Sequence, residues 1–254
     1  MIPKRDPIPE FIKFVKGWVG DIRNEHRIPK SQLPKWIPPA LREFYHQFGN
    51  YPAAKGRKRE SHIWMPLFSA EHMFYAPPKS DRSCEANRFA FWHENQGVVL
   101  AFTTPNQISP PVWIQDDPDG PFRLVDRRLD AFVVTLALQE IVFGARYLVN
   151  FDADAHVPQK IFRGRRRRLW ENSIRFDENS SNYSHTFWII DDKCIVFDQH
   201  GELWLAAKEP GWQEVLHQGV KTIDINENSP RPAYPVSQYG ESPTHSSDIG
   251  PLRT

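Results

Sequence analysis

The sequence is organised around one central stretch, Phe89-Ala90-Phe91-Trp92-His93-Glu94-Asn95-Gln96-Gly97-Val98-Val99-Leu100-Ala101-Phe102. Two apolar runs of strand-forming residue types flank a polar corner at residues 94 to 97. Gly97 tolerates positive φ and Asn95 can hydrogen-bond its own backbone, so the corner predicts a turn between two strands. A third strand signal follows at residues 110 to 114, and an Asp- and Pro-rich turn follows at residues 116 to 121. The pattern predicts a meander of short strands.

The order of motifs around this corner resembles the SUKH superfamily (Smi/Knr-like, immunity-protein type). Glu94-Asn95-Gln96-Gly97, an apolar strand and then Pro110-Pro111-Val112-Trp113 are similar to the central signature of that family. Residues 33 to 50 resemble its N-terminal helix, and Leu129-Asp130-Ala131-Phe132-Val133 stands where the family has its closing helix. The resemblance covers roughly residues 8 to 149.

What the resemblance implies is a non-catalytic recognition module. In bacteria such domains are mostly immunity proteins that bind and neutralise toxins, and in fungi a relative is a regulatory scaffold. No signature residue of the family is an established catalyst. The resemblance therefore implies a protein partner, for which a secreted polymorphic toxin is one candidate.

The remaining patterns predict an α+β protein, and the resemblance implies a mostly antiparallel, curved sheet flanked by helices. Residues 7 to 23 and 33 to 48 show helical recurrence, and the strongly apolar residues 129 to 147 predict a third helix. Strand signals after residue 161, with turns at 191 to 193 and 199 to 201, predict a second group of antiparallel strands. Whether these strands extend the first sheet or form their own stays open.

We therefore expect three parts in the chain. Residues 1–150 form the SUKH-like recognition module, and residues 151–226 form a β-rich extension or a small second subdomain. Residues 227–254 are rich in Pro, Ser and Gly and poor in apolar residues, which predicts a disordered, flexible tail.

Composition predicts a soluble cytoplasmic protein, because no apolar run approaches the length of a membrane span and no signal peptide is recognisable. The resemblance implies a bacterial protein. Two cysteines without paired spacing favour a reducing compartment. The net charge of +1 is unevenly distributed. Residues 1 to 68 carry 13 of the 32 Lys and Arg residues but only 6 of the 31 Asp and Glu residues. The rest of the chain carries 19 Lys or Arg and 25 Asp or Glu. Such an asymmetry can orient a charged partner.

No catalytic or metal-ligating pattern is recognisable, so we expect no enzyme activity, no metal and no cofactor. The ten histidines lack the spacings of metal-binding motifs, and neither cysteine has an activating context. Glu94, Asn95 and Gln96 combine a carboxylate with amides, as proton transfer would require. Their position at a tight corner makes backbone capping the stronger interpretation, although they could also present a polar face to a partner.

Arg163-Gly164-Arg165-Arg166-Arg167-Arg168 is the sharpest local charge feature. On a strand, alternate residues share a face, so Arg165 and Arg167 would act together. A solvated or acid-paired edge is the default interpretation, and phosphate or carboxylate binding is the alternative. We do not expect nucleic acid as the main partner.

The leading hypothesis from the sequence is protein recognition, in an immunity-type or regulatory adaptor role. A nucleic-acid-binding protein that uses the arginine run is the alternative, and an unrecognised hydrolase is a second one. The residues that we predict to contact a partner are Trp92, Glu94, Asn95, Gln96, Trp113, Arg165 and Arg167.

Overall fold

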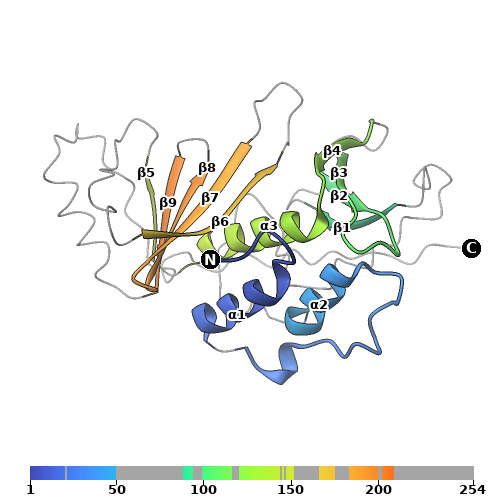
Figure 1. Cartoon of the computed structure of the whole chain (residues 1–254), viewed down its shortest axis with the longest axis horizontal. Coiled ribbons are helices and arrows are strands. Elements are labelled where there is room, and N and C mark those ends of the chain that lie inside the picture. Colours follow the sequence, from blue (N-terminus) through green and yellow to red (C-terminus); the bar gives the residue numbers. More distant parts are fainter. Residues whose placement is uncertain are drawn as a thin grey trace, which may run out of the picture.

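The computed structural model describes residues 1–20, 22–49, 88–93, 99–115, 120–143, 145, 147–151, 166–174, 183–199 and 202–208. Within these ranges the chain forms an α+β fold with two antiparallel sheets (Figure 1). Its helices are α1 (Ile8–Val19), the short 3₁₀ helix η1 (Asn24–His26), α2 (Pro39–Phe48) and α3 (Leu129–Phe143). None of the helices in these ranges is long and apolar enough to cross a membrane.

The first sheet has four strands in chain order, which are β1 (Phe89–His93), β2 (Leu100–Thr103), β3 (Val112–Gln115) and β4 (Arg123–Asp126). Each strand pairs antiparallel with the next, so the predicted meander is confirmed. The register shifts once between Ala90 and Trp92 and once between Val112 and Trp113. The predicted corner at residues 94–97 lies outside the described residues.

Helix α3 connects the two sheets and is apolar on every side. All but two of its 15 residues are buried, including polar Asp130, Thr135 and Gln139. A helix without a polar face must be covered all round. It packs on β4 of the first sheet, on β6, β8 and β9 of the second, and on α1 and α2. Figure 1 shows α3 running between the two sheets, with α1 and α2 below it.

The second sheet is separate from the first and has the strand order β5-β9-β8-β7-β6. Its strands are β5 (Tyr147–Phe151), β6 (Arg166–Ile174), β7 (Tyr183–Ile190), β8 (Cys194–Gln199) and β9 (Glu202–Ala207). The sequence pattern placed residue 147 in the third helix, but α3 ends at Phe143 and Tyr147 begins β5. Because β5 pairs with β9, the boundary predicted after residue 150 lies inside a strand of the second sheet.

The predicted turn at residues 191–193 is confirmed as the connection between β7 and β8. Asp191 and Asp192 have φ values of 48° and 55°, and Lys193 N donates to Ile190 O over 3.0 Å. Successive positive φ values are the mark of a tight hairpin turn whose twist matches that of the strands. Residues 209–254, which include the predicted tail, lie outside the described residues.

Helix α2 begins later than the sequence pattern predicts. It starts at Pro39, where the fixed φ of proline suits the first turn and its missing N–H costs no hydrogen bond. Arg42, Glu43 and His46 are half-buried on it rather than turned fully to solvent. His46 Nδ1 lies 2.8 Å from Ile28 O, which ties the preceding loop to the helix.

Gly49, which follows the last residue of α2, lies where a side chain would not fit. Its φ of −63° is open to any residue. A Cβ at Gly49 would lie 2.3 Å from Ile28 Cδ1 and 2.6 Å from the Tyr45 carbonyl oxygen. The loop therefore approaches the helix end too closely for a side chain.

We expect Gly49→Ala to lower the free energy of unfolding by about 1–3 kcal/mol, because the added methyl group overpacks this contact. Gly17→Ala is the matched control, since a Cβ at Gly17 in α1 meets nothing within 4 Å. Alanine also has the higher helix propensity, so this control should be neutral or stabilising by up to about 1 kcal/mol. Urea denaturation of both variants measures the difference, and equal stability of the two would contradict it.

Candidate functional site

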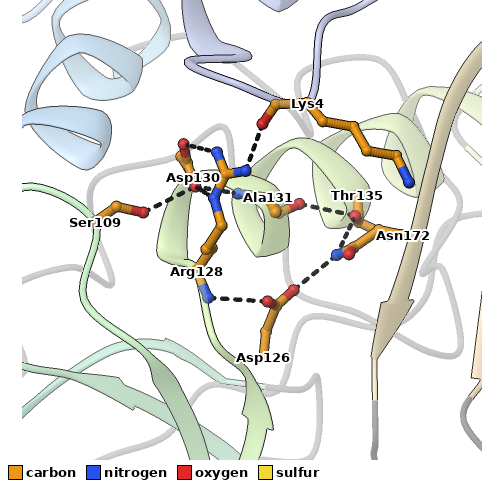
Figure 2. A network of polar contacts seen from close by, with 8 residues as sticks. All are labelled: Lys4, Ser109, Asp126, Arg128, Asp130, Ala131, Thr135 and Asn172. Atoms are coloured by element: carbon orange, nitrogen blue, oxygen red, sulfur yellow. Dashed lines mark hydrogen bonds and ion pairs between the residues drawn. The ribbon is translucent and has the colours of Figure 1, made fainter.

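A cluster of polar side chains lies where β4 leads into α3, and Figure 2 shows it. We call it the polar junction and define it by Asp126, Arg128, Asp130, Thr135 and Asn172. Its members come from β4, the connection to α3, α3 itself and β6 of the second sheet. Two carboxylates beside an arginine, an amide and a hydroxyl resemble the composition of an active site. Whether these groups could act on a substrate depends on the hydrogen bonds that they already make within the protein.

Asp130 accepts four hydrogen bonds from three residues at the start of α3. Arg128 pairs with both of its carboxylate oxygens, and Ser109 Oγ donates to Oδ1 over 2.9 Å. Ala131 N donates to the same oxygen over 2.8 Å, where the N-terminal end of the helix dipole favours a negative charge. Arg128 also donates to the backbone oxygen of Lys4. The Arg128–Asp130 ion pair therefore connects the N-terminal segment and the β2–β3 loop to α3.

Asp126 is only 9% exposed and connects the two sheets. Its Oδ2 accepts from Asn172 Nδ2 over 2.7 Å, and its Oδ1 accepts from Arg128 N over 2.9 Å. Burial raises the pKa of Asp126 to about 6, although these two hydrogen bonds and the charge of Arg128 act in the opposite direction. The nearby Asp130 carboxylate adds to the increase.

Thr135 connects α3 to β6 through its hydroxyl group. Its Oγ1 donates to Ala131 O over 2.8 Å and accepts from Trp170 Nε1 and Asn172 Nδ2 over 2.9 and 3.1 Å. With these bonds, every carboxylate and hydroxyl oxygen named in the polar junction has a protein partner. The junction is thus built as a connection between elements, and a substrate would have to displace bonds that join the two sheets.

The arginine run lies on β6, an edge strand of the second sheet, and only Arg166, Arg167 and Arg168 are described. All three are exposed. Arg167 pairs with Asp192 of the β7–β8 turn, Arg168 Nη1 lies 2.7 Å from Glu171 Oε2, and the Arg166 guanidinium lies 5.4 Å from the Trp188 ring centroid. Two of the three therefore pair with acids. The predicted contact residue Arg165 lies outside the described residues.

The two predicted tryptophans lie on different faces of the first sheet. Trp92 is 4% exposed, and its ring centroid lies 6.4 Å from that of Phe132 on α3. The prediction that Trp92 contacts a partner is therefore wrong, because its indole is part of the core. Trp113 is half-buried on the face turned away from α3. The predicted contacts Glu94, Asn95 and Gln96 lie outside the described residues.

Trp113 belongs to a row of residues that crosses all four strands on that outer face. Ala90 pairs with Phe102, Phe102 with Trp113, and Trp113 with Leu124. We call Ala90, Phe102, Trp113 and Leu124 the outer row. Its exposure increases toward β4, from 4% at Phe102 to 46% at Leu124. The outer row ends in an apolar side chain that solvent reaches.

Sequence reasoning missed Arg88, which lies against Trp113, and Phe122, which lies against Arg88. The Arg88 guanidinium carbon lies 4.2 Å from the Trp113 ring centroid and 4.6 Å from that of Phe122. Phe122 in turn packs edge-on against Phe102, with centroids 4.9 Å apart. The alternation of buried and half-buried residues along β3 could have indicated the outer position of Trp113, but no local signal indicates that Arg88 lies beside it.

Cys194 does not supply a reactive group. It is fully buried in β8, and burial raises the pKa of its thiol well above the ordinary range, which suppresses the thiolate. Within the part of the chain that the structure describes, no group of three or more His, Cys, Asp or Glu residues could hold a metal ion.

Asp126→Asn should remove a pH dependence of stability between about pH 4 and pH 6. In the folded protein the pKa of Asp126 is raised to about 6, whereas the unfolded value is near 3.9. The folded state therefore binds the extra proton across this window, so this carboxyl group makes stability fall as pH rises through it. Thermal unfolding of both proteins at several pH values measures the difference. The exposed Asp6→Asn is the control, and equal pH profiles of wild type and Asp126→Asn would contradict the prediction.

Thr135→Val should destabilise more than Thr103→Val, although each replaces a fully buried hydroxyl by a methyl group of similar size. At Thr135 the change deprives the buried Trp170 Nε1 of its acceptor and Asn172 of one acceptor, whereas Thr103 Oγ1 only donates to Pro111 O. Each buried group left unsatisfied costs about 1–3 kcal/mol. Chemical denaturation of the two variants tests the order, and the reverse order would reject this account of the polar junction.

Comparison with protein-family models, with curated proteins and with solved structures finds no match. The SUKH-like order of motifs therefore stays a prediction, and the function of the protein has to be inferred from the surfaces described above.

Proposed function

We propose that the protein is a non-catalytic recognition module that binds another protein through the outer face of β1–β4. The observation that carries this proposal is the outer row, in which Trp113 and Leu124 remain partly exposed on the face that α3 does not cover. Tryptophan and arginine are enriched among the residues that contribute most to protein interfaces. The Trp113–Arg88 pair therefore has the composition of such a centre.

The bonding of the polar junction and the burial of Cys194 support a non-catalytic function. The polar junction uses its carboxylates to hold α3, β4 and β6 together, and the buried Cys194 thiol is not activated. Arg167 and Arg168 pair with acids, which gives the nucleic-acid alternative less support than protein binding.

A SUKH-like module with an added sheet is the finer form of the proposal. In the described chain an N-terminal helix, a meander of strands and a closing helix follow one another, which is the order of the motifs that carry the resemblance. The second sheet would be this protein's own addition, packed on α3. By this proposal the protein is an immunity-type protein or a regulatory adaptor, and its partner is a protein such as a secreted toxin.

The test begins with capture of the partner from the native host on immobilised full-length protein. The purified binary complex is then measured by calorimetry, and suppression of the partner's toxicity by co-expression in bacterial cells tests the immunity role. A partner that is captured but not toxic would favour the adaptor role. A protein that forms no complex with any host protein and turns over a substrate instead would reject the proposal.

Trp113→Ala should weaken the complex at least about tenfold while leaving the fold intact, because the half-buried ring supplies contact area on the outer face. Trp92→Ala is the matched variant, and it should destabilise the protein by about 3–5 kcal/mol because the indole fills the core against Phe132. Calorimetric binding and thermal unfolding are measured on both variants. Full affinity in Trp113→Ala would place the binding face elsewhere.

A further inference from the structure

Arg88 occupies an unusual position on the outer face, because two aromatic rings hold its guanidinium group. The guanidinium carbon lies 4.2 Å from the Trp113 ring centroid and 4.6 Å from the Phe122 ring centroid. Stacking on aromatic faces fixes the guanidinium plane and uses none of its N–H donors. The side chain is thus held in place before any ligand arrives, and its hydrogen-bonding capacity stays unused by the rings.

The Arg88 donors also lack a polar partner in the described part of the chain. Its Nε is buried without a hydrogen bond, and no ion pair involves the side chain among the described residues. Other described arginines contrast with it, since Arg128 pairs with Asp130 and Arg168 pairs with Glu171. An arginine that aromatic rings hold in place, with no acid paired to it among the described residues, is prepared for an acid from outside.

The residues around Arg88 indicate what kind of acidic ligand could bind there. Of the residues in β1–β4, only Asp126 is acidic, and it faces the polar junction, where Asn172 binds it. Beside Arg88 lie the apolar Phe122 and the outer row with Trp113 and Leu124. In the part of the chain that the structure describes, the face therefore combines the Arg88 charge, without a paired acid, with an apolar strip.

We infer that Arg88 is the receptor for a carboxylate of the partner, carried by an acidic peptide segment that also lays an apolar side chain on the outer row. This inference rests on the proposed function, whose binding face it specifies. A planar carboxylate can accept two parallel hydrogen bonds from the guanidinium group, which gives direction as well as attraction. The neighbouring apolar side chain would cover Trp113 and Leu124.

The same observations disfavour nucleic acid at this site. A nucleic-acid groove repeats positive charges along a backbone, because each phosphate needs its own counter-charge. Among the described residues Arg88 lies beside the apolar Trp113 and Phe122, and the exposed arginines of β6 belong to the other sheet. A carboxylate with an apolar neighbour matches this surface better than a row of phosphates.

The experiment uses the full-length protein and fluorescently labelled eight-residue peptides, with fluorescence anisotropy as the readout. One peptide alternates Glu and Leu, a second alternates Gln and Leu, and a single-stranded DNA oligonucleotide of equal charge is the third ligand. We expect the Glu-Leu peptide to bind, the Gln-Leu peptide to bind at least about tenfold more weakly, and the oligonucleotide to bind more weakly than the Glu-Leu peptide. Absence of Glu-Leu binding, equal binding of the two peptides or tighter binding of the oligonucleotide overturns the inference.

Variants locate the site. Arg88→Gln and Arg88→Lys should each weaken Glu-Leu binding about tenfold or more, because the first removes the charge and the second the planar pair of donors. Arg168→Gln is the matched control on the other sheet and should bind as the wild type does. Thermal unfolding of each variant establishes that the fold is kept, and a folded Arg88→Gln with wild-type affinity would overturn the inference.

The captured partner separates failure of this inference from failure of the proposed function. If Trp113→Ala weakens the partner complex and Arg88→Gln does not, the outer face is the binding face but Arg88 is not its carboxylate receptor. If no protein partner forms a complex while the Glu-Leu peptide still requires Arg88, the carboxylate site stands and the proposed cellular role fails.

Discussion

Helix α3 has no polar face, and this constraint determines how the rest of the chain is arranged. A helix of this kind is stable in water only when other elements cover its whole circumference. In this protein both sheets and the helices α1 and α2 cover α3. The core around Phe132 is therefore continuous from the N-terminal helices to β8. The first and second sheets therefore depend on each other through one helix, even though no backbone ladder joins them among the described residues.

Covering a helix on all sides also buries polar groups, and the polar junction is the consequence. Asp130 lies in the first turn of α3, Thr135 lies further along it, and Asp126 ends β4 just before it. Each of these side chains is less than 10% exposed. A buried polar group destabilises the fold unless it is hydrogen-bonded. Asn172 and Trp170 of the second sheet supply that bonding, so the polar residues position the two sheets relative to each other.

The outer face of the first sheet is different because no described helix covers it. On β3 Ile114 is buried in the core, and its neighbour Trp113 lies on the opposite side with Leu124, as the period of two along a strand requires. A four-stranded sheet with one face against the core can therefore present a second face to a partner. The rings of Trp113 and Phe122 hold the Arg88 guanidinium group on that face. The face therefore has a positive charge in a fixed position, which an apolar patch alone would lack.

The sequence by itself determined the local elements of this protein. The turn chemistry and apolar runs between residues 89 and 126 predict the meander, and the continuous apolar run after Leu129 predicts α3, because periodicity and turn residues act over a few neighbours. It also singled out Trp113. The pairing of β5 with β9 was decided only by the tertiary structure, because strands that lie far apart in the chain pair through shared burial and leave no local mark. The same holds for the candidate site: which tryptophan faces the core, which acid each arginine meets and where Arg88 lies are set by packing against α3 and by strand register. Such contacts depend on residues distant in sequence, so the chain acquires them only when it folds.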